Sequence, residues 1–588
     1  MNKTSLHKSS GKVAMVAALL ASVFALPAHA ESTADAPPST SLAGNYLAAR
    51  VAASDKDTES AAKFYRQALK LDNDNGNLQL QSFLNFVANG DFAEAVKLGE
   101  GLSERANSPQ IVSLVQAVEE LRQKSWTTAN KALDEPWRSA LDRLIAGLLS
   151  GWSQVGQQNM AEALKTVDAL KGPAWFDLFT QYHGGLMAHA AGDDIEAVRR
   201  LEIAYANRAG GQAAIETYMR VVAALSQAYW RAGKKEQARN TIAQGLERAP
   251  QNPMLEALMA QMERDQEPVA MKISPQRGAA EVFLNLGTAL DKEGGEQFAR
   301  IYLQMARVLA PKDAAVTSKL AEQFDKQNQL VRANSLFEEI DEASPLHRVA
   351  RLEIALNLDE LEQVDEARAE MDKLIAAHPD DLVTHLSYGA VLSRHEKYDD
   401  AIEVYKKIIA RVDKPERYHW NLFYRLGIAY ERTKRWPMAE KTFKRALELY
   451  PDQPNVLNYL GYSWVDQNVN LQEGLDMIRK AVELRPSDGY IVDSLGWAYY
   501  RLGRFEEAVV ELERAVELRP GDPTINDHLG DAYWKAKRRL EATFQWQHAL
   551  ALDPPEADVA RIEDKLENGL DVVLERETAA SENKPDNG

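Results

Sequence analysis

The histidine side chains of this 588-residue chain do not form a recognisable metal or catalytic motif. His378 and His385 are seven residues apart, a spacing that would place both on one face of a helix. Pro379 follows His378 and interrupts such a helix, so the two imidazoles are not expected to bind a metal together. The eleven histidines are scattered, and none occurs in the His-Glu-x-x-His pattern of zinc hydrolases.

Two short segments partly match known catalytic or metal-binding motifs. Residues 151–155 (Gly-Trp-Ser-Gln-Val) begin like the nucleophile elbow of hydrolases, but Val155 stands where that turn needs glycine. Residues 72–76 (Asp-Asn-Asp-Asn-Gly) begin like a calcium loop, but Ser82 occupies the position of the closing acidic ligand. A turn between helices explains 72–76 better. We therefore predict a protein that is not an enzyme and that needs no cofactor and no metal.

The net charge and the absence of cysteine limit the kinds of partner and site that the protein can have. The chain has 69 Lys and Arg against 87 Asp and Glu, a formal net charge of −18. Such a chain repels the phosphates of nucleic acids and anionic lipids, so we expect no nucleic-acid partner. The sequence contains no cysteine, which excludes disulfides, thiolate metal sites, a cysteine nucleophile and a lipid-modified amino-terminal cysteine.

The amino terminus has the pattern of an export signal. Three lysines precede the uncharged, mainly apolar run 13–26, and Ala28 and Ala30 are the small residues that a signal peptidase reads. A run of this length is shorter than the roughly 20 residues that span a membrane. We predict a signal peptide over 1–30 that is cleaved after Ala30, a disordered lead-in at 31–41, and a mature periplasmic chain without a transmembrane segment. Peripheral attachment to the outer membrane is compatible with this pattern.

A repeat of 34 residues runs through most of the remaining sequence. Two consecutive units agree at seven positions, where Leu495, Gly496, Tyr499, Ala508, Leu512, Ala515 and Pro520 recur 34 residues later as Leu529, Gly530, Tyr533, Ala542, Trp546, Ala549 and Pro554. The small residue that opens the second helix can be followed from Ala61 to Ala542, and Gly474 replaces alanine in one unit. These residues and their period resemble the tetratricopeptide repeat (TPR) family, whose unit is a helix-turn-helix.

The resemblance implies an all-α fold, a right-handed TPR superhelix (α-solenoid) of about 14 helix-turn-helix repeats with a carboxy-terminal capping helix. We expect a degenerate amino-terminal array at 42–252, a helix plus linker at 253–279 and a carboxy-terminal array at 280–556. The capping helix follows at 557–576, and a disordered tail at 577–588. The linker either separates two stacks or is a longer loop within one continuous superhelix. The glycines, alanines and prolines of the repeat are expected to serve packing and not chemistry.

The family resemblance also implies a concave groove lined by the first helix of each repeat. Repeat positions 2, 5, 9 and 12 share one face of that helix by helical spacing. These positions predict a partner-binding groove formed by Tyr424, Ile428, Asn455, Asn458, Tyr462, Tyr490, Asp493, Trp497, Tyr500, Asp527, Asp531 and Trp534. Aromatic rings supply contact area and Asn pairs with peptide groups, so the face suits an extended peptide or a partner helix.

The last repeats are similar to those of Gram-negative periplasmic TPR scaffold and adaptor proteins. This similarity implies an exported protein that scaffolds or adapts protein–protein interactions in the cell envelope and holds a peptide or partner segment in its groove. The alternative is a component of a polysaccharide secretion or export system, in which long TPR arrays bridge the two membranes. A hydrolase of envelope polymers is disfavoured, because no catalytic constellation is present.

Overall fold

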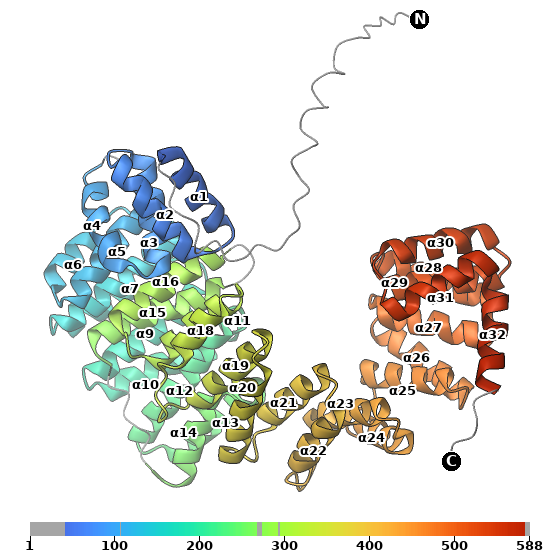
Figure 1. The fold of residues 1–588 in the computed structure, drawn as a ribbon. Helices are drawn as coiled ribbons and strands as arrows, with labels where there is room; N and C mark the ends of the chain where they lie inside the picture. Colours follow the sequence, from blue (N-terminus) through green and yellow to red (C-terminus); the bar gives the residue numbers. More distant parts are fainter. Residues whose placement is uncertain (1–40, 106–107, 267–272, 292–294, 583–588) are drawn as a thin grey trace, which may run out of the picture. The chain divides into compact units, whose positions relative to one another are not determined.

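A computed structural model of the chain describes residues 41–105, 108–266, 273–291 and 295–582. These residues form helices and no strand, so the all-α prediction is confirmed (Figure 1). About 14 consecutive helical pairs are present in the described residues, as the period predicted. The predicted signal peptide (1–30) and all but the last residue of the lead-in (31–41) lie outside the described residues.

The chain divides into two compact units, Met1–Asn357 and Leu358–Gly588. The first contains α1 (Leu42–Ser54), α2 (Thr58–Leu71), α3 (Gly76–Asn89), α4 (Phe92–Ser103), α5 (Gln110–Arg122), α6 (Trp126–Leu133), α7 (Ala140–Gly156), α8 (Met160–Asp168), α9 (Phe176–Ala190), α10 (Asp194–Ala206), α11 (Arg208–Ala213), α12 (Ile215–Arg231), α13 (Lys235–Arg248), α14 (Pro253–Glu263), α15 (Pro275–Leu290), α16 (Glu296–Leu309), α17 (Ala314–Asp325) and α18 (Leu330–Phe337). The division falls within α19 (His347–Glu360).

The second unit continues with α20 (Val364–Ala377), α21 (Leu382–Arg394), α22 (Tyr398–Ile409), the short 3₁₀ helix η2 (Arg417–His419), α23 (Trp420–Arg432), α24 (Trp436–Leu449), α25 (Pro454–Asp466), α26 (Leu471–Leu484), α27 (Gly489–Arg501), α28 (Phe505–Leu518), α29 (Pro523–Lys535), α30 (Arg539–Ala551), α31 (Glu556–Asn568) and α32 (Leu570–Glu582). The predicted single capping helix 557–576 is therefore two helices, because Gly569 has a φ of 82° and interrupts the helical path. Helix α32 continues to Glu582, so the first part of the tail predicted to be disordered is helical.

Polar caps and left-handed turns set the ends of the helices. The Asn75 side chain accepts a hydrogen bond of 3.1 Å from the Leu78 amide and caps α3, so segment 72–76 is a turn between helices, as predicted. Gly503 and Lys537 have φ values of 73° and 65° in the turns of the last two repeats, and close each first helix before its partner begins.

The two helices of a pair approach closely where the repeat has its small residues. A Cβ on Gly496 would lie 2.5 Å from Leu512, and one on Gly530 would lie 2.4 Å from Trp546. In the pair α25–α26 the backbones themselves meet. A Cβ on Gly474 would lie 2.8 Å from the carbonyl oxygen of Gly461, which explains why glycine replaces the usual alanine there.

The first unit folds back on itself. Helices α15 and α16 pack against α3, α5, α7, α9 and α12, which are the first helices of the preceding repeats (Figure 1). All residues from 299 to 306 in α16 are buried, so this helix contacts protein on every side. The repeat after the 253–279 segment therefore forms the core of the first unit. The sequence left open whether 253–279 separates two stacks or is a longer loop within one, and the compact units divide elsewhere, between residues 357 and 358.

Helix α15 docks on α7 and α9 through a small residue and a short polar chain. A Cβ on Gly278 would lie 2.3 Å from the Trp152 indole, so only glycine permits this approach. The Trp152 Nε1 donates to His183 Nδ1 at 3.2 Å, and the Asn285 amide lies 3.4 Å from His183 Nε2. Burial lowers the pKa of His183 to about 3, so the imidazole is neutral and serves as a packed hydrogen-bonding group.

Polar side chains of α16 and α18 reach the carbonyl groups at the ends of α1 and α3. Arg300 Nη1 donates to the Lys56 carbonyl at 3.4 Å, and Gln304 Nε2 donates to the Ala88 carbonyl at 3.3 Å. Arg332 Nη2 donates to the Asn89 carbonyl at 2.6 Å. These bonds satisfy helix-end carbonyls that no residue of their own helix can satisfy, and they join segments more than 200 residues apart.

The close contact of α25 and α26 makes a testable prediction. Gly474→Ala, which restores the residue found in the other repeats, should destabilise the second unit by about 1–3 kcal/mol because the new methyl group meets the Gly461 carbonyl. Denaturant unfolding of the full-length protein, followed by circular dichroism, measures this change. Gly521→Ala is the matched control, since a Cβ at Gly521 meets no atom within 4 Å. Equal effects of the two substitutions would contradict the proposed backbone contact.

Candidate partner-binding site

The twelve predicted groove residues all lie on α23, α25, α27 and α29, the first helices of four consecutive repeats. We call the face of these helices that carries them the inner face. Residues of successive first helices lie beside each other, and His528 of α29, which was not among the twelve, stacks on Trp497 of α27. The structure brings some of the predicted residues together, and it uses others for packing or for the carboxy-terminal cap.

Tyr424 and Ile428 are half-buried residues of α23. The Tyr424 ring lies 6.1 Å from Phe443 of its own repeat and 6.0 Å from Tyr459 of the next repeat. Burial raises the pKa of Tyr424, as expected for a phenol packed among rings. Tyr424 therefore joins two repeats, and little of its ring remains for a partner.

The middle of the inner face keeps part of its surface exposed. Tyr490 is 52% exposed, and its ring lies 4.9 Å from the Arg519 guanidinium. Asn455 accepts a hydrogen bond of 3.1 Å from Arg485, and Asn458 and Tyr462 are half-buried beside it on α25. Burial raises the pKa of Tyr462 to about 12, and the nearby Asp466 and Asp493 carboxylates add to this shift. The tyrosine therefore stays a neutral donor at any physiological pH.

Trp497 is the centre of a stack of three rings. Its indole lies 4.6 Å from the Tyr500 ring and 4.1 Å from His528, in both cases nearly parallel. His528 Nδ1 lies 3.0 Å from the buried Asp493 carboxylate. Burial alone would lower the pKa of His528, but the Asp493, Asp527 and Asp531 carboxylates together outweigh it and raise that pKa.

The last three predicted residues are in contact with the cap. The Lys565 ammonium of α31 is fully buried, 2.8 Å from Asp527 and 2.7 Å from Asp531. Asp531 also accepts a hydrogen bond of 3.0 Å from Trp546. The Trp534 indole donates to Asp571 of α32 at 3.0 Å. The structure therefore places Asp527, Asp531 and Trp534 beneath α31 and α32.

Sequence reasoning missed three residues that organise this face, namely His528, Arg561 and Lys565. Arg561 lies 3.7 Å from Asp527, four residues before Lys565 on the same helix. A signal for Lys565 was present: it follows Ile562 by three residues and so shares the apolar face of the capping helix. A lysine at such a position needs a carboxylate partner, and the inner face supplies two.

The structure also shows where the other candidate motifs of the sequence lie. His378 ends α20 and His385 lies in α21, with its Nδ1 2.7 Å from the Asp381 carbonyl, so the two histidines do not share a helix. The partial elbow 151–155 lies inside α7. Within the described ranges, no group of three or more metal-ligating side chains comes together, and no helix is long and apolar enough to cross a membrane.

Comparison with known families agrees with this architecture. Family models described as tetratricopeptide repeat match residues 352–418, 391–454 and 424–489, with further matches at 43–75 and 220–252. A model described as TPR repeat matches 496–537. The chain belongs to the TPR family. Its fold is that of an interaction scaffold, in which repeats present a surface to protein partners.

Relatives of this TPR protein are similar over different portions of the chain. A TPR repeat-containing protein of Pseudomonas aeruginosa is 30% identical over 147 residues, which are 25% of this chain and 24% of that protein. The chain thus spans about a quarter of the length of this curated relative. The structure titled APC/C hetero-tetramer Cut9–Hcn1 is 15% identical, with 90% of this chain and 96% of that chain covered and a TM-score of 0.37. Yeast Tom70 is 14% identical, with 74% and 96% covered and a TM-score of 0.35.

The buried lysine of the cap makes a second prediction. Lys565→Met removes the buried cation and leaves the two carboxylates with only the more distant Arg561, at 3.7 and 3.9 Å, so α31 and α32 should be destabilised by about 3–5 kcal/mol at neutral pH. Burial and the neighbouring Asp527 raise the pKa of Asp531. A raised carboxyl pKa favours the folded state at low pH and less so as pH rises, so the defect should shrink towards about pH 5.

Hydrogen exchange of the α31 and α32 amides in the full-length protein measures this effect. Lys480→Met is the control, because the Lys480 side chain is 48% exposed and pairs only with Glu483 on its own helix. A Lys565→Met protein with wild-type protection of α31 at pH 8 would contradict the role of the ion pairs.

Proposed function

We propose that this TPR protein is an exported periplasmic scaffold that holds an amphipathic helix of a partner protein on the inner face of α25 and α27. The observation that carries the proposal is the uneven cover of the first helices. In the first unit they are covered by α15 and α16, and in the last repeat by α31. Between α25 and α27, Tyr490 is 52% exposed and its aromatic neighbours are only half-buried.

The helices that cover other parts of the first-helix face indicate which kind of partner segment this surface can bind. Each covered stretch is covered by a helix and not by an extended strand. The partner helix proposed here would repeat the chemistry of α31, with an apolar side towards Tyr462 and Trp497. Asp466 and Asp493 lie close enough to Tyr462 to raise its pKa and supply carboxylates to this surface, where Asp466 also pairs with Arg501 at 3.1 Å and Asp493 with His528 at 3.0 Å. A partner helix with two basic residues four positions apart, as Arg561 and Lys565 are in α31, complements that charge.

Export is supported by the residues at the start of the chain. The three early lysines, the apolar run 13–26 and the small residues Ala28 and Ala30 have the order of a cleaved signal peptide. The lack of cysteine is compatible with an oxidising compartment, where free thiols are a liability. The proposal therefore places the scaffold in the cell envelope, with envelope proteins as partners.

The binding surface can be tested with a defined probe. An 18-residue synthetic helix with one leucine-rich face and two lysines four positions apart should bind the full-length protein saturably. The triple substitution Tyr462→Ala, Tyr490→Ala and Trp497→Ala should weaken that binding by about 2 kcal/mol or more, because aromatic contacts dominate such interfaces. Fluorescence anisotropy of the labelled helix gives both affinities.

Phe544→Ala is the matched control, since Phe544 is a 61% exposed aromatic residue on the second helix α30. A second probe with glutamates in place of the lysines should bind less tightly. Equal affinity of wild type and triple variant for the basic helix would reject the inner face as its site. Tighter binding of the acidic probe would reject the proposed charge pattern.

Localisation has a separate test. Fractionation of cells that express the full-length gene, followed by amino-terminal sequencing, should find a periplasmic protein that begins at Glu31. A chain that keeps Met1 and remains in the cytosol would contradict export without touching the binding surface.

A further inference from the structure

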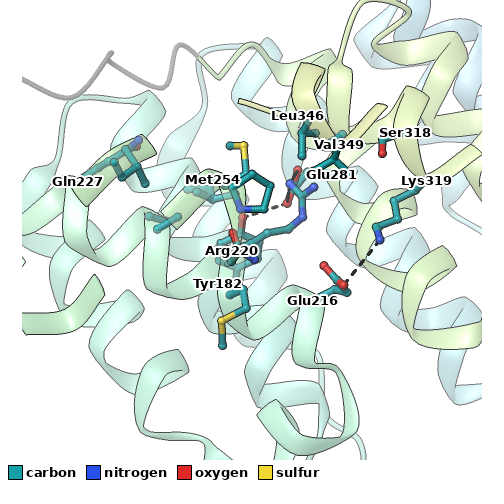
Figure 2. A pocket seen from close by; sticks show the side chains of 18 of the residues that line it. Tyr182, Glu216, Arg220, Gln227, Met254, Glu281, Ser318, Lys319, Leu346 and Val349 are labelled. Carbon is teal, nitrogen blue, oxygen red and sulfur yellow. Dashed lines mark hydrogen bonds and ion pairs between the residues drawn. The ribbon is translucent and has the colours of Figure 1, made fainter. Parts of the chain in front are cut away.

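The first unit encloses a cavity of about 360 Å³ between the inner side of α9 and α12 and the helices that fold back over them. Tyr182 of α9, Arg220 of α12 and Glu281 of α15 meet at one wall, and Met254 of α14 lies beside them (Figure 2). Lys319 of α17 also lines the cavity and reaches towards Glu216 of α12. This volume is within the range of ligand-binding clefts, and the protein–protein surface proposed above does not include it.

The charged residues of the cavity cancel one another. Three bases line it, Arg220, Arg277 and Lys319, and three acids, Glu216, Glu281 and Glu322. Arg220 pairs with Glu281 at 3.1 Å, and Lys319 pairs with Glu322 at 2.8 Å and lies 3.7 Å from Glu216. Arg277 pairs with Asp313 at 3.0 Å outside the lining. A ligand ion of either sign would therefore meet no net opposite charge, so an ionic ligand is disfavoured.

One polar group of the wall has unused donors. Both hydrogen bonds that Arg220 makes to described residues use Nη1, at 3.2 and 3.1 Å from the Glu281 oxygens. Its Nη2 and Nε groups are left to donate to a carbonyl oxygen within the cavity. Glu281 is also held by the Tyr182 hydroxyl, which donates to its Oε1 at 3.0 Å. The guanidinium is thus held in place with a free edge.

The rest of the lining is apolar or an uncharged amide. Two methionines, Met219 and Met254, contribute flexible side chains that adapt to different shapes. Leu186, Leu258 and Val349 add aliphatic surface, and amide side chains such as Gln227 and Asn252 add hydrogen-bonding groups. Peptide matches this mixture, because it has carbonyl and amide groups without charge beside an aliphatic side chain.

We infer that this cavity is a second binding site, specific for a short uncharged peptide segment that places an aliphatic or methionine side chain against Met219 and Met254 and a backbone carbonyl on the free edge of Arg220. The site is separate from the inner face of the second unit, and the inference does not rest on the proposed function. It gives the chain two binding sites of different chemistry, one for a basic helix and one for an uncharged segment.

Three capped, fluorescein-labelled decapeptides test the inference on the full-length protein. All have a Gly/Ser background, and their two central residues are Leu-Leu, Met-Met or Ser-Ser. Fluorescence anisotropy should show saturable binding of the Leu and Met peptides, at least tenfold tighter than the Ser peptide. Unlabelled decanoate and maltose serve as competitors that represent an acyl carboxylate and a glycan, and neither should displace the peptide.

Met254→Trp should weaken binding of the Leu peptide at least tenfold, because Met254 is 42% exposed at the cavity and a larger ring there fills its space. Met438→Trp is the matched control, since Met438 is 48% exposed in the second unit and lies outside the cavity. The double variant Arg220→Gln with Glu281→Gln removes the guanidinium without leaving a lone charge, and it should also weaken binding. Circular dichroism verifies that each variant is folded.

Several results would overturn the inference. These are equal anisotropy for the three peptides, unchanged affinity in both Met254→Trp and the double variant, and displacement by decanoate or maltose. The triple variant of the second unit separates the two proposals. It should bind the Leu decapeptide as the wild type does, whereas Met254→Trp should bind the basic helix as the wild type does.

Discussion

Close approach of the two helices within each pair is the constraint on which the rest of this structure depends. Glycine or alanine at the crossing allows the second helix to reach the first, as at Gly496 and Ala508, and each pair then packs on the next with the same geometry. The result is an array in which a repeat buries surface mainly against its neighbours. Such an array leaves the inner side of its first helices without a partner from the repeat itself. The remaining differences between parts of the structure concern which helices cover that inner side.

The first unit covers it with one of its own repeats. Helices α15 and α16 lie against the first helices of earlier repeats, and Gly278 provides the same close approach to Trp152 that glycines provide within a pair. The neutral His183 joins Trp152 and Asn285, and its lowered pKa is a consequence of this burial. The cover leaves a cavity between α9, α12, α15 and α17 unfilled. That cavity is therefore a product of the fold-back and not of any single repeat.

The sequence predicted the periodic part of this architecture and not the fold-back. Repeats are visible because Gly496, Ala508 and Pro520 recur at a fixed spacing, and the helical phase then places residues such as Trp497 on the first-helix face. The contact of Asn285 with His183 joins residues 102 positions apart, and nothing in the local pattern of either helix identifies the other. Helical phase also cannot tell an exposed ring from one that a neighbour covers. Tyr424 and Trp534 have the same phase as Trp497, yet Phe443 covers one and the cap engages the other.

The helices that cover the first-helix face share one further property. Each carries two polar side chains four residues apart that bond to the repeats beneath: Glu281 and Asn285 on α15, Arg300 and Gln304 on α16, and Arg561 and Lys565 on α31. An apolar helix could slide by one turn along an apolar surface at little cost, but a displaced carboxylate or guanidinium would lose its partner while still buried. The paired polar groups therefore fix the register of a docked helix more than they add to its affinity. A helix that binds between α25 and α27 meets carboxylates that already have partners, Asp493 with His528 at 3.0 Å and Asp466 with Arg501 at 3.1 Å, so its own basic groups would have to join these pairs to fix its register.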